Sequence, residues 1–389
     1  MKNKNSSQNN SSEELLHHIP DIEIIDLEAD NDIDPLEASP TQDSMPESDE
    51  QSFQYMPTPS KGKKAALGGF NSRIIHLALL AVIVLFVLGI VYKIANWGVK
   101  VKPEDIVPGE YNNTLDSILP LVDTSGKTIR RDYSGDITIL AFGNAPFADD
   151  RNSNDSLINM IREKTNATIY NCSVSGSYLA AEEPSLNEWE CPSDAFNFYW
   201  LCLMAAGNKD IAQKYLNCLG FLGDSAPPEA MEVYDTLTTL DMNTVDVVVL
   251  MYDGSDYLAG HEMYSDSNRT DIQQFTGNME AGIEVLQQTY PHIRIIVMSP
   301  PYAFGLDENG KYVSSDIQRY GWSVLSTYVI KQADSAYYRL VSFVDNLYGT
   351  VNEDEAPQYL TDHIHLNVEG RKRVAERFVN ALYLYNDEP

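Results

Sequence analysis

Basic residues and cysteines are scarce in this chain. Its 389 residues include 27 Lys and Arg against 57 Asp and Glu, which gives a formal net charge of −30. A phosphate backbone repels such a chain, so the composition argues against a nucleic-acid-binding protein. Glycine and proline are also few, at 22 and 19 residues, while 43% of the residues are hydrophobic. These values exclude a collagen-like chain and a chain disordered throughout, and they leave room for one large folded domain.

Aromatic residues are absent before Phe53, and residues 1–60 carry 14 Asp and Glu against two Lys. Such a segment buries too little apolar surface to offset chain entropy, so we expect an acidic disordered tail over 1–60. Acids and aliphatic residues alternate within it from Ile19 to Asp30. That run is either part of a solvated tail or a segment that folds on a cytosolic partner.

Acidic residues are missing from 61–102, where all seven charges are basic. We assign 61–73 to a basic juxtamembrane segment and 74–97 to a transmembrane helix. The nineteen residues from Ile74 to Tyr92 contain no Asp, Glu, Lys or Arg, and at about 1.5 Å per residue they span the ~30 Å hydrocarbon core. Four basic residues precede the span and three follow it closely. This slight bias predicts a single-pass cell-membrane protein with a cytoplasmic tail and an extracellular C-terminal domain.

All four cysteines, Cys172, Cys191, Cys202 and Cys218, follow the predicted membrane span. An even number of cysteines in an exported domain suggests up to two disulfides, with the pairing left open. Four reduced thiols in a cytosolic domain are the alternative. No C-x-x-C spacing occurs, so no zinc site is indicated. We predict neither a bound metal nor a cofactor.

After a tether over 98–132, apolar runs alternate with amphipathic segments. Strands are expected at Ile137–Phe142, Ala167–Tyr170, Val245–Met251, Ile293–Met298 and Leu340–Val344. Helices are expected from Leu157, over Phe196–Leu219 with a break near Gly207 and an end at Gly220, and over Ile272–Tyr290, Asp316–Asp334 and Val368–Leu384. Buried strands separated by helices pair in parallel through right-handed crossovers. The pattern predicts an α/β fold over 133–389, a three-layer α/β/α sandwich with a mainly parallel sheet, flavodoxin-like in type.

Ligands of such folds bind beyond the carboxyl ends of the strands, so the loops that follow the strands are informative. Gly143-Asn144-Ala145 follows the first predicted strand, and a serine-rich loop from Asn171 to Ser177 follows the second. The third strand leads into Asp253-Gly254-Ser255-Asp256. Asp362-His363-Ile364-His365 stands just before the last helix.

This order of loops resembles the SGNH (GDSL-like) hydrolase family over about residues 134–385. Asp362-x-x-His365 is the most specific element, and in the family it supplies the catalytic His and the Asp that orients it. Gly176 fits the second block, whose backbone N–H stabilises the oxyanion. The resemblance implies a hydrolase of acyl esters, such as acetyl groups on cell-envelope glycans, with His365 and Asp362 as catalytic residues.

Two departures from the family pattern bear on the chemistry. Ala145, next to Asn144, stands where the family has its nucleophilic serine, and alanine has no atom that attacks a carbonyl. Ser255, next to Asp256, replaces the asparagine that donates to the oxyanion. Loss of one such donor costs about 10²–10³ in rate. The oxyanion or cleft candidates are therefore Asn144, Ala145, Gly176, Ser255 and Asp256.

A base without a serine partner leaves several alternatives open. One alternative is that another hydroxyl, that of Ser173, Ser175 or Ser177, is the nucleophile. A second alternative is that His365 activates water directly. Carboxylates at the same sheet edge, Asp149, Asp150, Asp253 and Asp256, offer ligands for a cation such as Ca²⁺. The last alternative is a surface module without catalysis that binds a glycan or envelope component.

Overall fold

The computed structural model describes residues 80–84, 87, 114–321 and 323–386. The chain forms two compact units, Met1–Gly98 and Val99–Pro389. The predicted acidic tail over 1–60 and the basic segment over 61–73 lie outside the described residues. Of the predicted membrane segment, residues 80–84 and 87 are described, and they are helical. Within these described ranges, no helix is long and apolar enough to cross a membrane.

A five-stranded parallel sheet forms the centre of the second unit. It consists of β3 (Thr138–Gly143), β4 (Thr168–Asn171), β5 (Val247–Met251), β6 (Arg294–Met298) and β9 (Ser342–Val344), in the order β4-β3-β5-β6-β9. Every residue of β5 and β6 is buried, as expected for strands covered on both faces. The order is that of a flavodoxin-like doubly wound fold.

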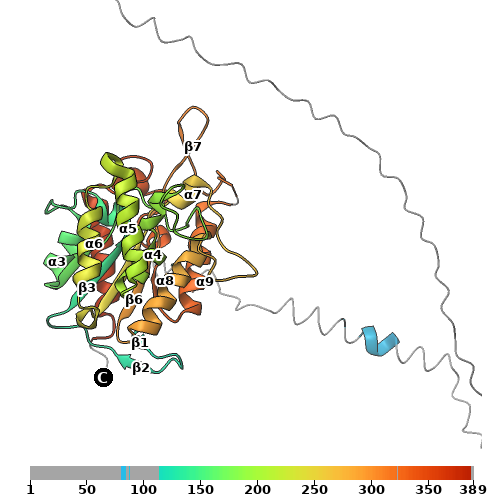
Figure 1. The fold of residues 1–389 in the computed structure, drawn as a ribbon. Coiled ribbons are helices and arrows are strands. Elements are labelled where there is room, and N and C mark those ends of the chain that lie inside the picture. The colour runs from blue at the N-terminus through green and yellow to red at the C-terminus, as the bar shows by residue number, and fades with distance from the viewer. Residues whose placement is uncertain (1–79, 85–86, 88–113, 322, 387–389) are drawn as a thin grey trace, which may run out of the picture. The chain divides into compact units, whose positions relative to one another are not determined.

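Helices cover the sheet on both faces. The helix α3 (Leu157–Thr165) packs against α12 (Val368–Tyr383). Figure 1 shows the other long helices side by side along one face: α4 (Phe198–Ala205), α5 (Lys209–Leu222), α6 (Ala230–Thr239), α8 (Phe275–Thr289) and α9 (Leu325–Tyr338). Because the chain moves from β3 in one direction and then from β5 in the other, right-handed crossovers place α3 opposite α8 and α9. The predicted α/β fold with a parallel sheet is confirmed.

Short elements join these layers. Two small hairpins are formed by β1 (Leu121–Val122) with β2 (Thr128–Arg130) and by β7 (Gly305–Leu306) with β8 (Tyr312–Val313). The short helices are α2 (Ala145–Ala148), η2 (Pro192–Phe196), η3 (Gly223–Ser225), η4 (Met242–Thr244), α7 (Ser255–Ala259), α10 (Asn346–Gly349) and α11 (Ala356–Tyr359). Two of them, α2 and α7, directly follow central strands and carry candidate site residues.

Two predicted helix boundaries differ from the structure. The break near Gly207 is present between α4 and α5, with a φ of 82° at that glycine, but α5 continues past Gly220 and ends at Gly223. The helix expected from Asp316 starts only at Leu325. Gly321 has a φ of 61° and lies tightly against the Gly260 backbone, so the chain cannot be helical there.

Part of the predicted tether belongs to the folded unit. Ser117 forms an antiparallel bridge with Phe343 of β9. The backbone of Leu119 both donates to and accepts from the Ser342 hydroxyl, at 3.0 and 2.8 Å. Residues 117–119 therefore cover part of the β9 edge of the sheet, which would otherwise expose unpaired backbone groups. The rest of the predicted tether, 98–113, lies outside the described residues.

All four cysteines are free thiols. The prediction of up to two disulfides is therefore wrong. The cysteines then give no support for an exported domain. Cys172 follows β4, Cys202 lies in α4 and Cys218 lies in α5, and all three are buried in the hydrophobic core. Burial raises the pKa of the Cys202 thiol well above its ordinary value. These side chains act as small apolar residues that fill the core.

Gly143 is the residue at which the first loop of the site leaves the sheet, and its replacement tests the packing there. A Cβ added to Gly143 would lie 1.9 Å from the Met251 carbonyl oxygen, so Gly143→Ala should lower the free energy of unfolding by about 3 kcal/mol or more. Gly220→Ala is the matched control, because no atom lies within 4 Å of its added Cβ. In an exposed helix position this control should stabilise by about 0.5–1 kcal/mol. Urea denaturation measures both, and equal midpoints would contradict the packing.

Candidate active site

The loops after β3, β4 and β5 are cross-linked by one side chain, Asn144. Its amide nitrogen donates to the Ser177 carbonyl at 3.0 Å and to Asp253 Oδ1 at 2.8 Å. Its amide oxygen accepts from the Asp253 backbone N–H at 2.9 Å. Asn144 is 1% exposed. The sequence placed Asn144 among the cleft candidates, but its amide is used within the protein to hold three loops together.

The segment that carries His365 packs against the loops after β5 and β6. The Phe304 backbone N–H, just before β7, donates to the His363 carbonyl at 2.7 Å. A Cβ on Gly254 would lie 3.0 Å from Ala303 Cβ and 3.9 Å from Ile364 Cδ1. The loops after β5 and β6 and the segment before α12 are therefore packed against one another at the carboxyl edge of the sheet.

Asp362 and His365 form a hydrogen-bonded pair in this segment. Asp362 Oδ2 lies 2.7 Å from His365 Nδ1, and Oδ1 accepts the backbone N–H groups of Ile364 and His365 at 2.9 and 2.8 Å. Burial acts to raise the pKa of Asp362, but these hydrogen bonds outweigh it and lower that pKa to about 2. The anionic carboxylate fixes the proton on His365 Nδ1 and leaves Nε2 as the basic nitrogen.

His365 is partly exposed and surrounded by negative charge. Its side chain is 41% exposed. Burial lowers its pKa, but the hydrogen bond and charge of Asp362 raise it more, together with the charges of Asp149 and Asp253. The net result is a pKa above the ordinary value. His365 thus binds protons more tightly than a free histidine and becomes a base only at higher pH.

The four acids considered as cation ligands do not converge. Asp150 pairs with Arg371 of α12 at 2.6 Å, and Asp253 is bonded to Asn144. Burial raises the pKa of Asp149. Burial also raises the pKa of Asp253, although hydrogen bonds from Ser255 and Asn144 act to lower it. In the part of the chain that the structure describes, no group of three or more His, Cys, Asp or Glu is arranged to hold a metal ion.

Two backbone N–H groups in the loops after β3 and β4, those of Ala145 and Gly176, have no acceptor among the described residues. Ala145 is buried at the start of α2 and has no polar side-chain atom. Gly176 is exposed, and its φ of 72° is a backbone conformation that favours glycine. Among the described residues, neither backbone N–H has a hydrogen-bond acceptor.

Of the three serines after β4, two have hydroxyls that donate to other groups, and the third is held by its backbone. The buried hydroxyl of Ser173 donates to Asn171 Oδ1 at 2.6 Å, and that of Ser177 donates to the Val174 carbonyl at 2.8 Å. Ser175 is exposed, and its backbone N–H donates to Glu229 at 2.6 Å. The structure records no contact between these three residues and His365.

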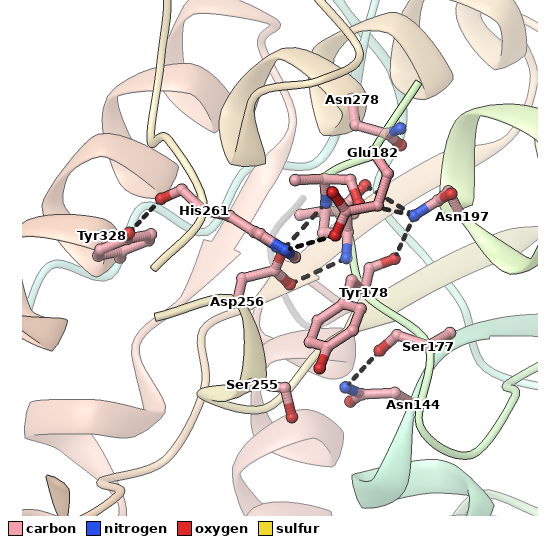
Figure 2. A network of polar contacts seen from close by, with 12 residues as sticks. Asn144, Ser177, Tyr178, Glu182, Asn197, Ser255, Asp256, His261, Asn278 and Tyr328 are labelled. Atoms are coloured by element: carbon pink, nitrogen blue, oxygen red, sulfur yellow. Dashed lines mark hydrogen bonds and ion pairs between the residues drawn. The ribbon is translucent and has the colours of Figure 1, made fainter. Parts of the chain in front are cut away.

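A second histidine–carboxylate pair holds the loop after β4 against α7 (Figure 2). Buried Asp256 accepts the backbone N–H groups of Leu179 and Ala180, both at 2.9 Å, and lies 2.8 Å from His261 Nδ1. His261 Nε2 lies 3.3 Å from Glu182. Burial lowers the pKa of His261, but the two carboxylates raise it overall. Asp256 is thus held within this network, and no motif in the sequence marked His261 as a candidate.

Aromatic side chains lie on the loop after β4 and beside the segment that carries His365. The Tyr178 ring is 37% exposed, lies 4.7 Å from the His261 ring, and is on the side of the network that faces Ser177, Asn144 and Ser255 (Figure 2). Burial and then the charges of Asp256 and Asp253 raise its pKa. A row of three rings lies beside the His365 segment. The Phe304 and Tyr312 rings are 5.6 Å apart, and the Tyr312 and His363 rings are 5.9 Å apart. The hairpin β7–β8 that carries Tyr312 projects from this edge of the sheet (Figure 1).

No protein-family model and no curated protein matches the chain. Solved structures that match include a possible lipase from Chitinophaga pinensis, 11% identical with a TM-score of 0.40 over 64% of this chain and 98% of that one. Est24, a carbohydrate acetylesterase from Sinorhizobium meliloti, is 13% identical with a TM-score of 0.39 over 64% and 99%. A protein provisionally titled a GDSL-like lipase, from Parabacteroides merdae, is 14% identical with a TM-score of 0.37 over 66% and 100%. Likenesses this low bear on neither the activity nor the substrate of this chain.

Proposed function

We propose that the folded domain hydrolyses acyl esters, with His365 as the general base and Asp362 as the residue that orients it. The observation that carries this proposal is the 2.7 Å bond between Asp362 and His365 Nδ1. It fixes the tautomer and leaves Nε2 on a partly exposed ring at the edge where ligands of this fold bind. The open backbone N–H groups of Ala145 and Gly176 support a site for a developing oxyanion.

We propose esters of carbohydrates, such as acetylated cell-envelope glycans, as the substrate class. The exposed parts of Tyr178 and Tyr312 flank the site, and aromatic faces bury the apolar faces of sugar rings. Asp149 and Asp253 near His365 disfavour a substrate that is itself strongly anionic at the reacting group. A neutral acetyl ester on a sugar satisfies both conditions.

A second candidate function is binding of the same glycans without catalysis. Ala145 favours it, because the position of the family's nucleophile carries no reactive atom. The two candidates differ in one measurable property, since only the first releases a carboxylic acid from the ester.

Ester turnover by the full chain in detergent, measured from pH 5 to 9, tests the proposal. We expect hydrolysis of p-nitrophenyl acetate and of an acetylated oligosaccharide, with kcat/KM falling as the pH drops through a pKa above about 6.5. The sign follows from the raised pKa of His365, because protonation below that pKa removes the base. A folded chain that binds the oligosaccharide without releasing acetate at any pH would favour the second candidate.

We further propose that the chain is anchored in the cell membrane through 74–97, with its tail in the cytoplasm and its hydrolase domain outside. The uninterrupted apolar run from Ile74 to Tyr92 and the excess of basic residues before it support this orientation. Residues 80–84 are helical with exposed apolar side chains, which is compatible with a lipid environment. Retention of the full chain in membranes washed with alkaline carbonate tests the anchor, and release into the supernatant would contradict it.

A further inference from the structure

A histidine between two carboxylates joins the loop after β4 to α7. His261 Nδ1 lies 2.8 Å from Asp256 Oδ1, and Nε2 lies 3.3 Å from Glu182 Oε1. Asp256 belongs to α7, whereas Glu182 belongs to the loop after β4 (Figure 2). The imidazole therefore links two segments that both carry candidate site residues.

The two contacts require a proton on each ring nitrogen of His261. A carboxylate accepts hydrogen bonds and donates none, and a neutral imidazole carries only one N–H. Asp256 is buried and also accepts two backbone N–H groups of the loop, while the Glu182 side chain is 57% exposed. When the ring loses one proton, the remaining N–H stays with the buried Asp256, and Nε2 presents a lone pair to Glu182. The contact with Glu182 is thus the one that depends on the cation.

The backbone of His261 is fixed by the elements around it. Its N–H donates to the Asp256 carbonyl at 3.1 Å, and its carbonyl accepts from the Tyr328 hydroxyl of α9. Gly260, the preceding residue, packs against Gly321, since an added Cβ on Gly260 would lie 3.2 Å from the Gly321 nitrogen. The ring therefore has a set position relative to α7 and α9, and it orients the loop after β4 against them.

Tyr178 is the side chain of that loop that packs on the ring. The two ring centroids are 4.7 Å apart and the ring planes are at 75°. The next two residues, Leu179 and Ala180, donate their N–H groups to Asp256. A cationic imidazole attracts a neighbouring tyrosine ring more strongly than a neutral one. Protonation of His261 thus bears directly on a tyrosine that we propose packs on sugar rings.

We propose that His261, as a cation, is a positioning residue that holds Asp256 and Glu182 together, keeps the Tyr178 ring in place and thereby sets the affinity for the sugar part of the substrate. This inference rests on the proposed glycan substrate. Loss of one proton releases Glu182 and weakens the hold on Tyr178, so sugar affinity falls as the pH rises. His261 has no part in the acyl transfer itself.

The carboxylates that face His261 decide the pH range. Burial lowers the pKa of His261, but the hydrogen bonds and charges of Asp256 and Glu182 raise it above the ordinary value of 6.5. The contribution of the cation is therefore fully present below about pH 6.5 and is lost as the pH rises through the higher pKa of the folded chain. The carboxylate of Glu262, the next residue, accepts from Gln274 at 2.7 Å.

Two phenols also contact His261, Tyr178 from the loop after β4 and Tyr328 from α9. Burial raises the pKa of both phenols above their ordinary value of 10. Both stay protonated from pH 5 to 9, so a change of affinity in this range does not come from them.

The variant Glu182→Gln tests the link in the full chain in detergent. In wild type we expect KM for acetylated xylotetraose to rise by about 3–10-fold from pH 6 to pH 9. The midpoint of that rise should lie about 0.5–1 pH unit lower in Glu182→Gln, because one of the two charges that favour the cation is removed. KM for p-nitrophenyl acetate, which has no sugar, should stay constant with pH in both chains. Glu183→Gln is the matched control, since it removes the adjacent carboxylate and leaves Glu182 in place, and it should keep the wild-type midpoint.

Nuclear magnetic resonance of the full chain in detergent reports the link without a ligand. We expect both ring nitrogens of His261 to be protonated at pH 6, with the signals identified by their absence in His261→Gln. The ring protons of Tyr178 should shift with the same midpoint as His261. A neutral His261 at pH 6, or Tyr178 signals that do not follow its titration, would overturn the inference.

The kinetic outcomes separate this inference from the proposed hydrolysis. Release of acetate with a KM for acetylated xylotetraose that does not change with pH would overturn the inference alone. If the chain releases no acetate, the same pH dependence is measured as Kd, and affinity that falls with rising pH would uphold the positioning role while the hydrolase proposal fails. Failure to bind acetylated xylotetraose at every pH would overturn both the glycan proposal and this inference.

Discussion

Replacing His365 with alanine is expected to reduce kcat/KM for ester hydrolysis by about 10³-fold, within the range of general acid–base catalysis. The substitution removes the imidazole that is hydrogen-bonded to Asp362, and with it the proposed base. The side chain is 41% exposed, so its loss should change the free energy of unfolding little. Steady-state kinetics of the full chain measure the effect.

His363→Ala is the matched control for this variant. His363 lies in the same segment and its ring contacts Tyr312 at 5.9 Å, but no carboxylate is hydrogen-bonded to it. The control should raise KM modestly and leave kcat near the wild-type value. Equal losses in the two variants would show that the segment matters only for folding, and full activity of His365→Ala would remove the proposed base.

Asp362→Asn is expected to lower kcat/KM by about 10²–10³-fold and to move the acid limb of the pH profile to lower pH. The carboxylate fixes the His365 tautomer, and its charge is a principal cause of the raised pKa of His365. Without that charge, His365 loses its proton at a lower pH. Activity therefore falls overall, while the remaining activity persists further into the acidic range.

A second capped aspartate provides the control for Asp362→Asn. Asp307 lies in the β7–β8 hairpin, where the backbone N–H groups of Asn309 and Lys311 donate to Oδ1 at 2.9 and 2.8 Å and lower its pKa. Asp307→Asn removes a similar carboxylate without touching His365 and should leave the acid limb in place. A limb that stays unmoved in Asp362→Asn would contradict the proposed coupling.

The sheet and most of its helices could be predicted from local patterns. The run Val247–Met251 is continuously apolar because both faces of β5 are covered. Large apolar residues recur at spacings of three or four along Phe275–Thr289, which marks it as a helix although every residue from Phe275 to Ile283 is buried. The pairing of Asp362 with His365 was implied by the resemblance to the SGNH family, and the structure brings the two side chains to 2.7 Å.

The predictions were wrong, or assigned no element, where a contact with residues distant in the sequence decides the backbone conformation. Residues 316–324 have helical composition, but Gly321 meets the backbone of Gly260 and the helix starts at Leu325. Residues 114–132 lack a strong period of their own and are ordered by hydrogen bonds to β9, more than 200 residues later in the chain. Such contacts leave no periodic signal in the sequence near either partner.

The amino-acid sequence by itself determined the α/β fold, the order of the loops at its carboxyl edge and the composition of each loop. Only the tertiary structure decided which polar groups are free to react. Asn144 and Asp256 hold neighbouring loops together, the hydroxyls of Ser173 and Ser177 donate to groups of the same loop, and three of the four cysteines fill the core as thiols. The physical reason is that a buried polar group must find a partner, and the partner comes from whichever loop folding brings beside it.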